Sequence, residues 1–229
     1  MLIIGHRGAG GTAPENTLKS FEKAVQAGVK MIELDVHQCA GGELVVIHDE
    51  KINRTTNGKG LVSEKTLTEL ENVDAGQGEK IPLLSEVLDL VDHRAMINIE
   101  LKGARVAVPV YELLKKYKKD FGWNTDDFCI SSFDHQQLSD FRNVDRKTKI
   151  GILYPRYPHG FVKLADELQP FSINLSLRTV KPGLVKEIHA LGLEVWVYTV
   201  NELFDLEHLE TLGVDAVFTN YPAKLLHHN

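Results

Sequence analysis

The sequence predicts an α/β protein built as a closed barrel of eight β/α units, and three observations support this prediction. Short apolar runs of strand length alternate with segments whose apolar residues recur every three or four positions, as they do in helices. The runs expected to be parallel strands number eight within 229 residues, which suits a TIM (β/α)8 barrel. Polar and charged residues stand at the ends of several of these strands. A doubly wound open sheet is the competing layout.

The elements follow one another in a regular order along the chain. The eight parallel strands are expected to end near His6, Asp35, Lys102, Phe133, Tyr154, Leu177, Thr199 and Thr219. Helices are expected at about residues 14–27, 82–91, 109–119, 135–143, 160–168, 182–191 and 203–212, with a short tail after residue 222. Because no Gly/Ser-rich or Pro-rich linker interrupts this order, the sequence predicts a single TIM-barrel domain over residues 1–229.

An antiparallel hairpin is expected directly after the second strand. The chain turns at Ala40-Gly41-Gly42 and a second apolar run follows at residues 43–47. A parallel pair needs a crossover of about a dozen residues or more, so this second run must return antiparallel and bring His48 back toward the second strand. Residues 49–80 are polar. They are expected to form an insertion, which is short for a domain but long for a loop, and to lie as an ordered loop over the active face.

Acidic residues at the strand ends predict a metal site. Glu33 and Asp35 share one face of the second strand because side chains alternate, and Glu100 ends the third. The carboxyl ends of the strands carry the active site in TIM barrels. Three acids converging there would repel one another without a cation. Oxygen ligands favour a hard ion, so the sequence predicts one divalent cation, Mg²⁺ or Ca²⁺, held by Glu33, Asp35 and Glu100.

Basic residues beside these acids predict a phosphate site. Arg7 and Lys102 add positive charge to the same barrel mouth, which favours an anionic oxygen group. Phosphodiester cleavage needs one proton removed from a nucleophile and one given to the leaving alcohol. His6 and His48 are the candidates, with His6 preferred as the base and His48 as the acid. The other histidines are expected at surface or solvated positions: His37, His93, His135, His159, His189, His208, His227 and His228. Trp196 is expected in the core or in the pocket wall.

Composition limits the partners. The formal net charge of −6 argues against nucleic acid or an anionic membrane as the main partner. Cys39 and Cys129 are the only cysteines and are expected to be reduced thiols. No apolar run approaches the ~18 residues that span a bilayer, and no charged segment followed by a long apolar one, as expected of a leader, stands before the first strand. A cytoplasmic protein without stable membrane insertion is expected, and the sequence leaves the oligomeric state open.

Several short motifs together resemble the glycerophosphodiester phosphodiesterase family, and the resemblance runs from the first strand to the last. They are HRG at 6–8, PENT at 14–17, ELDV at 33–36, VVIHD at 45–49, RTTNGKG at 54–60, IPLLSEVL at 81–88, NIELK at 98–102, SSF at 131–133 and VYTVN at 197–201. The resemblance implies a TIM-barrel enzyme that hydrolyses a small-molecule glycerophosphodiester substrate to sn-glycerol 3-phosphate and an alcohol.

The resemblance also implies a role for each site residue. The residues matching His6 and His48 are the family's acid/base pair. Those that match its cation ligands are Glu33, Asp35 and Glu100, and those that match its phosphate contacts are Arg7 and Lys102. The loop at 49–80 is similar to a compact form of an insertion that shapes the alcohol side of the pocket.

Two positions depart from the family pattern, and two rival functions stay open. The family usually has Trp where this chain has Tyr198, against the glycerol, and Asp where this chain has Asn220. The first rival is a cyclising phospholipase-type phosphodiesterase on the same barrel, against which the small hairpin loop and the lack of a membrane-seeking segment count. The second is a barrel that binds glycerophosphodiesters without turnover, for which two titrating histidines have no use.

Overall fold

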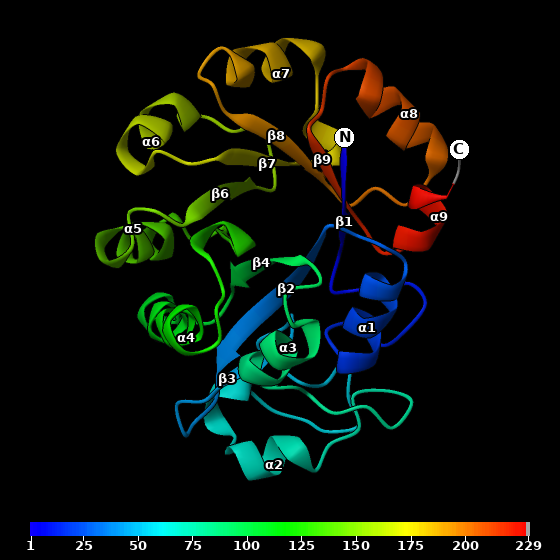
Figure 1. The fold of residues 1–229 in the computed structure, drawn as a ribbon, viewed down its shortest axis with the longest axis vertical. Coiled ribbons are helices and arrows are strands. Elements are labelled where there is room, and N and C mark those ends of the chain that lie inside the picture. The colour runs from blue at the N-terminus through cyan, green and yellow to red at the C-terminus, as the bar shows by residue number, and fades with distance from the viewer. Residues whose placement is uncertain (228–229) are drawn as a thin grey trace.

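The computed structural model describes residues 1–227 and shows a closed barrel (Figure 1). Its parallel strands, in chain order, are β1 (Leu2–Gly5), β2 (Met31–Gln38), β4 (Met96–Leu101), β5 (Phe128–Ser132), β6 (Lys149–Tyr154), β7 (Ser172–Ser176), β8 (Glu194–Tyr198) and β9 (Ala216–Thr219). Strand β1 pairs in parallel with both β9 and β2, which closes the sheet. The TIM barrel is therefore confirmed, and the open doubly wound sheet is excluded.

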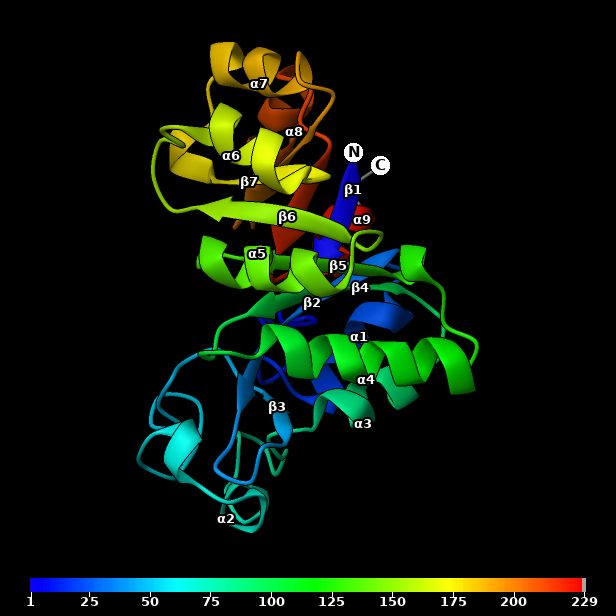
Figure 2. The same ribbon diagram turned by 90° about the vertical axis from the view of Figure 1, so that its left-hand side faces the viewer.

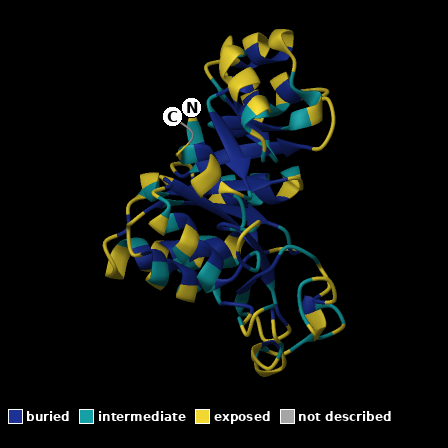
Figure 3. Cartoon of the chain, turned by 90° about the vertical axis from the view of Figure 1, so that its right-hand side faces the viewer, coloured by how far each residue is buried: buried dark blue, intermediate teal, exposed yellow. Residues whose placement is uncertain are grey.

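Helices follow the strands and cover the outside of the barrel (Figure 3). They are α1 (Leu18–Gln26), α3 (Leu84–Val91), α4 (Ala107–Asp120), α5 (His135–Val144), α6 (Phe161–Leu168), α7 (Pro182–His189), α8 (Leu203–Thr211) and α9 (Pro222–Leu226), with 3₁₀ turns η2 (Thr125–Asp127) and η3 (Leu177–Thr179). Their apolar faces pack on the buried strands in one large core. The chain end expected to be a plain tail instead forms α9.

Helix α1 begins later than the sequence predicts. The expected start was residue 14, but Asn16 has a left-handed φ of +58° and lies outside the helix. Thr17 caps the helix instead, because its side chain accepts a hydrogen bond from the Ser20 amide at 3.3 Å. The turn at Asn16 directs its side chain inward to the barrel, so the late start of α1 serves the site described below.

The predicted hairpin is present. Strand β3 (Leu44–Val46) lies antiparallel to β2, with Val36 opposite Val46. The pairing ends where the Ile47 amide donates to the Asp35 carbonyl at 3.0 Å. The next residue, His48, is thereby held beside the part of β2 that carries Asp35.

The insertion at residues 49–80 is more structured than a loop. It contains the 3₁₀ turn η1 (Val62–Glu64) and helix α2 (Leu67–Glu71), which a Thr66–Glu69 capping box begins. A second apolar cluster holds it together: Cys39, Val45, Ile47, Ile52, Val62, Leu70, Ala75 and Ile81. In Figure 2 the insertion (cyan) lies on the side toward which β6 points, the carboxyl side of the barrel.

The barrel interior changes from apolar to polar along its axis. A cluster including Ile4, Met31, Trp196 and Phe218 fills the centre, and Trp196 is buried as predicted. Both cysteines are free thiols. Among residues 1–227, no helix combines the length and the apolar character needed to cross a bilayer.

Candidate active site

A pocket of about 130 Å³ lies at the carboxyl ends of the strands. Its lining includes residues from seven of the eight barrel strands or the loops after them, and also His48 after the hairpin. The predicted site residues in this lining are His6, Arg7, Glu33, His48, Glu100, Lys102 and Tyr198. The structure therefore brings these residues together at one mouth.

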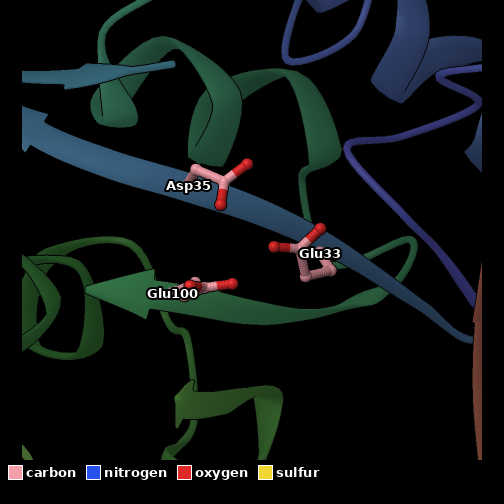
Figure 4. Close-up of side chains that lie close together, drawn as sticks. All are labelled: Glu33, Asp35 and Glu100. Carbon is pink, nitrogen blue, oxygen red and sulfur yellow. The ribbon is translucent and has the colours of Figure 1, made fainter. Parts of the chain in front are cut away.

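Glu33, Asp35 and Glu100 form a compact acidic triad (Figure 4). One carboxylate oxygen of each lies within 4.8 Å of the others. Sheet register explains the arrangement, because Asp35 on β2 pairs with Glu100 on β4 and Glu33 is two positions earlier on the same face. All three are buried, with at most 8% of each residue exposed.

The triad has oxygens without partners. In the described part of the chain, Glu33 Oε1 and Asp35 Oδ1 have no hydrogen-bond partner. Glu100 Oε1 lies 2.8 Å from Lys102 Nζ but without the angles of a hydrogen bond. Burial and the charge of Asp35 raise the pKa of Glu33, and the same causes raise the pKa of Glu100 to about 7. Buried oxygens that repel one another in this way fit a divalent cation.

Arg7 reaches the triad from the loop after β1. Its backbone amide donates to Glu33 Oε2 at 2.9 Å, and its Nε lies 3.4 Å from Asp35 Oδ2. The turn depends on Gly8, which has a φ of +80° and packs so closely on α1 that a Cβ would lie 2.6 Å from the Ser20 backbone. Arg7 itself has a φ of +53°.

Lys102 stands on the other side of the triad. Its Nζ lies 3.8 Å from Asp35 Oδ1 and 5.3 Å from the centre of the Phe133 ring. Burial alone would lower the pKa of Lys102, but the charges of Glu100 and Asp35 raise it. Both basic residues therefore stay charged beside the pocket.

The two predicted histidines have different partners. His6 Nδ1 lies 2.7 Å from Asn220 Oδ1, and its Nε2 is 3.9 Å from Glu33 Oε2. Burial and the nearby charge of Arg7 lower the pKa of His6 to about 4, so the ring is neutral at pH 7. His48 Nδ1 lies 2.5 Å from Asp49 Oδ1, and 28% of its side chain is exposed.

Comparison with known proteins identifies the family to which the chain belongs. The family model described as "Glycerophosphoryl diester phosphodiesterase family" matches residues 6–224. The chain belongs to this family. Both the family and the enzyme class predicted from the sequence are confirmed. Asn220, which pairs with His6 in this phosphodiesterase, is one of the two positions that the sequence analysis named as departures from the family pattern.

Relatives and solved structures extend the match over nearly the whole chain. A glycerophosphodiester phosphodiesterase of Caldanaerobacter subterraneus subsp. tengcongensis is 37% identical, covering 98% of this chain and 96% of the relative. One from Bacillus altitudinis is also 37% identical, covering 96% and 94%. An Oleispira antarctica phosphodiesterase solved with the product sn-glycerol-3-phosphate superposes with a TM-score of 0.93 at 30% identity, covering 99% of this chain and 95% of that chain.

Four residues at the phosphodiesterase site were missed by sequence reasoning. Asn16 Nδ2 donates to Asp35 Oδ2 at 2.8 Å, and Asn16 Oδ1 accepts from the Asp35 amide at 3.3 Å. The other three are charged residues around the pocket: Glu15, Asp49 and Arg54. Their motifs, PENT, HD and RTTNG, were visible in the sequence, but the contacts between them were not.

One expectation about a histidine was wrong. His37, predicted at a surface position, is only 5% exposed, and its Nε2 lies 3.1 Å from the His48 carbonyl. Strand alternation could have predicted that His37 is buried, because His37 shares a face of β2 with Glu33 and Asp35. His135 is half-buried against the Tyr154 ring. The expected exposure is confirmed for His93, His159, His189, His208 and His227, and His228 lies outside the described residues.

Tyr198 forms part of the pocket wall. Its ring meets the Phe133 ring edge-on, with 5.7 Å between centroids. Its hydroxyl donates to the Tyr154 carbonyl at 2.7 Å. The two rings form an apolar part of the pocket wall.

Proposed function

We propose that this enzyme hydrolyses glycerophosphodiesters to sn-glycerol 3-phosphate and an alcohol. The observation that carries the proposal is the buried triad with unpaired oxygens, set between two basic residues and two histidines in one pocket. The complex of the Oleispira antarctica relative with sn-glycerol-3-phosphate supports the choice of product.

Glu33, Asp35 and Glu100 would hold one divalent cation, Mg²⁺ or Ca²⁺, because their oxygens are hard ligands and one oxygen of each lacks a hydrogen-bond partner in the described part of the chain. When bound, the cation supplies Lewis-acid polarisation of the phosphoryl oxygens. Asn16 fixes the Asp35 carboxylate, and the Arg7 amide fixes that of Glu33. These bonds orient the ligands before the cation arrives.

Arg7 and Lys102 bind the phosphate and stabilise the negative charge that grows in the transition state. Both line the pocket, and both are ion-paired with the triad. Tyr198, in the apolar wall, contacts the glycerol moiety.

His6 is the general base and His48 the general acid. Asn220 Oδ1 can only accept a hydrogen bond, so His6 carries its proton on Nδ1 and leaves the Nε2 lone pair toward the pocket. Its lowered pKa leaves the ring unprotonated at pH 7, so Nε2 is free to accept a proton from the nucleophile, which is water or the substrate's 2-hydroxyl. His48, at the pocket rim, gives its proton to the leaving alcohol.

Product release tests the proposal. Glycerophosphodiesters with choline, ethanolamine, glycerol or inositol head groups are incubated with the protein and Mg²⁺, Ca²⁺ or Mn²⁺, and glycerol 3-phosphate is measured. Turnover that EDTA stops, and that His6→Ala or His48→Ala reduces by on the order of 10²-fold or more, supports the proposal. Saturable binding without product would favour the non-catalytic barrel, and a stable cyclic phosphate would favour the cyclising enzyme.

Three wider expectations stay predictions. The first is a single catalytic domain over residues 1–229, in which the insertion at 49–80 lies over the active face. The others are a small molecule rather than nucleic acid as the partner, and a cytoplasmic location.

A further inference from the structure

Arg54 of the insertion joins two carboxylates from different parts of the chain. Its Nε donates to Asp49 Oδ2 at 2.7 Å and its Nη2 to Asp49 Oδ1 at 3.0 Å. Its Nη1 donates to Glu15 Oε2 at 3.0 Å and its Nη2 to Glu15 Oε1 at 2.7 Å. Arg54 therefore grips both oxygens of each carboxylate, a geometry for which the flat guanidinium fork is suited and a lysine is not.

The first carboxylate controls the orientation of His48. Asp49 Oδ1, which Arg54 holds, is also the oxygen 2.5 Å from His48 Nδ1. A carboxylate oxygen accepts, so His48 Nδ1 donates and Nε2 is the ring atom left for the pocket. The hydrogen bonds and the charge of Arg54 and His48 lower the pKa of Asp49 despite partial burial, so Asp49 stays ionised.

The second carboxylate anchors Arg54 to the barrel. Glu15, in the loop before α1, also accepts from Arg7 Nη1 at 2.8 Å. Burial opposes its charge, but the hydrogen bonds from Arg54 and the charge of Arg7 lower the pKa of Glu15 to about 2. A continuous line of hydrogen-bonded side chains thus runs from His48 through Asp49, Arg54 and Glu15 to Arg7.

The fold of the insertion puts Arg54 in this place. Ile52, two residues earlier, is fully buried in the insertion's own apolar cluster. The Thr56 amide donates to the Ile52 carbonyl at 3.1 Å, which closes a turn around Arg54. Nearly half of the Arg54 side chain is exposed, so an isolated ion pair here would contribute little. Four hydrogen bonds to two fixed partners restrict Arg54 far more than such a pair.

We propose that Arg54 is a positioning residue for His48: it braces Asp49 against Glu15, and Asp49 in turn holds the imidazole with Nε2 toward the leaving alcohol. The inference rests on the proposed function for the role of His48 as the proton donor. It gives the insertion a part in catalysis through the RTTNG motif, in addition to any part in shaping the pocket.

A double-mutant cycle tests the inference with two substrates. Arg54→Ala, His48→Ala and the double variant are assayed with glycerophosphocholine, whose leaving alcohol needs a proton, and with the p-nitrophenyl ester of glycerol 3-phosphate, whose leaving group does not. Arg94→Ala is the matched control, because Arg94 is similarly exposed and grips Glu22 with the same two-pronged geometry away from the pocket. Melting temperatures are measured for every variant.

If the inference is right, Arg54→Ala lowers kcat for glycerophosphocholine about tenfold or more, a part of the ~10²–10⁴-fold that a general acid contributes. Its kcat for the nitrophenyl ester falls less than about threefold, and its KM changes little. Added to His48→Ala, the same substitution reduces kcat less than about twofold further, because residues acting through one group are not additive. Arg54→Lys recovers only part of the loss, and Arg94→Ala leaves both substrates unaffected.

Other results overturn the inference at separable points. Equal losses from Arg54→Ala in the parent and in the His48→Ala background would mean that Arg54 does not act through His48. Equal losses on both substrates, together with a lower melting temperature, would mean a structural role alone. If His48→Ala itself treats the two substrates alike, the acid role of His48 in the proposed function fails, and the inference that rests on that role fails with it.

Discussion

The buried carboxylates at the two ends of the barrel differ in how fully their oxygens are hydrogen-bonded. At the amino end, after α5, Asp145 accepts from the Lys147 amide at 2.8 Å, the Thr148 amide at 3.0 Å and Thr148 Oγ1 at 2.7 Å, and it lies 3.2 Å from Lys118 Nζ. At the carboxyl end, Glu33 and Asp35 each keep a buried oxygen without a hydrogen-bond partner in the described part of the chain. The first arrangement serves stability, and the second keeps oxygens free for a ligand.

The pKa values differ in the same sense. Hydrogen bonds from Thr148 and Lys147 overcome the effect of burial and lower the pKa of Asp145 to about 2, whereas burial and neighbouring charge raise the pKa of Glu100 to about 7. A lowered acid pKa adds stability above the usual pKa, and a raised one removes stability as pH rises. Charge at the carboxyl end therefore destabilises the metal-free protein, while charge at the amino end stabilises it.

The largest effect is expected from Glu33→Gln. The substitution keeps the shape of the side chain but removes one anionic ligand of the proposed cation. Because a Lewis-acid metal contributes several kcal/mol to the transition state, we expect a loss of activity on the order of 10³-fold. The measurement is glycerol 3-phosphate release at saturating metal.

The stability of the same variant sharpens the comparison. Without metal, Glu33→Gln should unfold at the same temperature as the parent or higher, since it relieves repulsion within the triad. Substantial activity in this variant, or a clear destabilisation without metal, would mean that the triad is a structural cluster like that of Asp145.

The next effect is the stabilisation of the protein by metal. A ligand that binds only the folded state adds about 2.7 kcal/mol at 100 times its Kd. Adding Mg²⁺ or Ca²⁺ to chelator-treated protein should therefore raise the melting temperature of the parent and have little effect on Glu33→Gln. Equal shifts in both proteins would place the ion away from the triad.

At the amino end, Asp145→Asn should destabilise the protein without changing its chemistry. The difference between the ordinary pKa of 3.8 and the folded pKa of about 2 corresponds to about 2 kcal/mol near neutral pH. This stability is fully present above about pH 4 and is lost as pH falls through 2. Denaturant unfolding from pH 7 to pH 3 should show the gap between parent and variant closing toward the acid end. The kcat of the variant at 25 °C should equal that of the parent. A gap independent of pH would contradict the assignment.

The elements that local pattern determines were predictable from the sequence. Strand alternation and helical spacing predicted the eight parallel strands, the antiparallel return and the carboxyl-end location of the site. The hairpin length alone required His48 to return toward Asp35, and the pocket that His48 shares with Glu33 and Glu100 is in keeping with this. These features depend on short-range sequence spacing, which a single sequence contains.

Contacts between distant segments were not predictable. Helix α2 was missed because its five residues lie among polar and glycine-rich residues, and its burial depends on an apolar cluster completed by the hairpin. Asn16 reaches Asp35 across 19 residues, and Arg54 reaches Glu15 across 39. Nothing in either local sequence specifies those partners, because tertiary folding alone brings them together.

The smallest effects are expected from substitutions of the individual partners of Asp145, which show which contact stabilises the amino end. Thr148→Val keeps the volume but removes a buried hydrogen bond to a charged oxygen, so we expect a loss of about 1.5 kcal/mol. Lys118→Met removes an ion pair that is partly exposed on the lysine side, so we expect about 0.5 kcal/mol, decreasing as salt is added. Denaturant unfolding at low and high salt measures both. If Lys118→Met proved the costlier change, opposite charge rather than hydrogen bonding would hold Asp145. Because the triad also has nearby cations in Arg7 and Lys102, the three triad oxygens that lack hydrogen-bond partners in the described part of the chain would then no longer explain the contrast between the two ends.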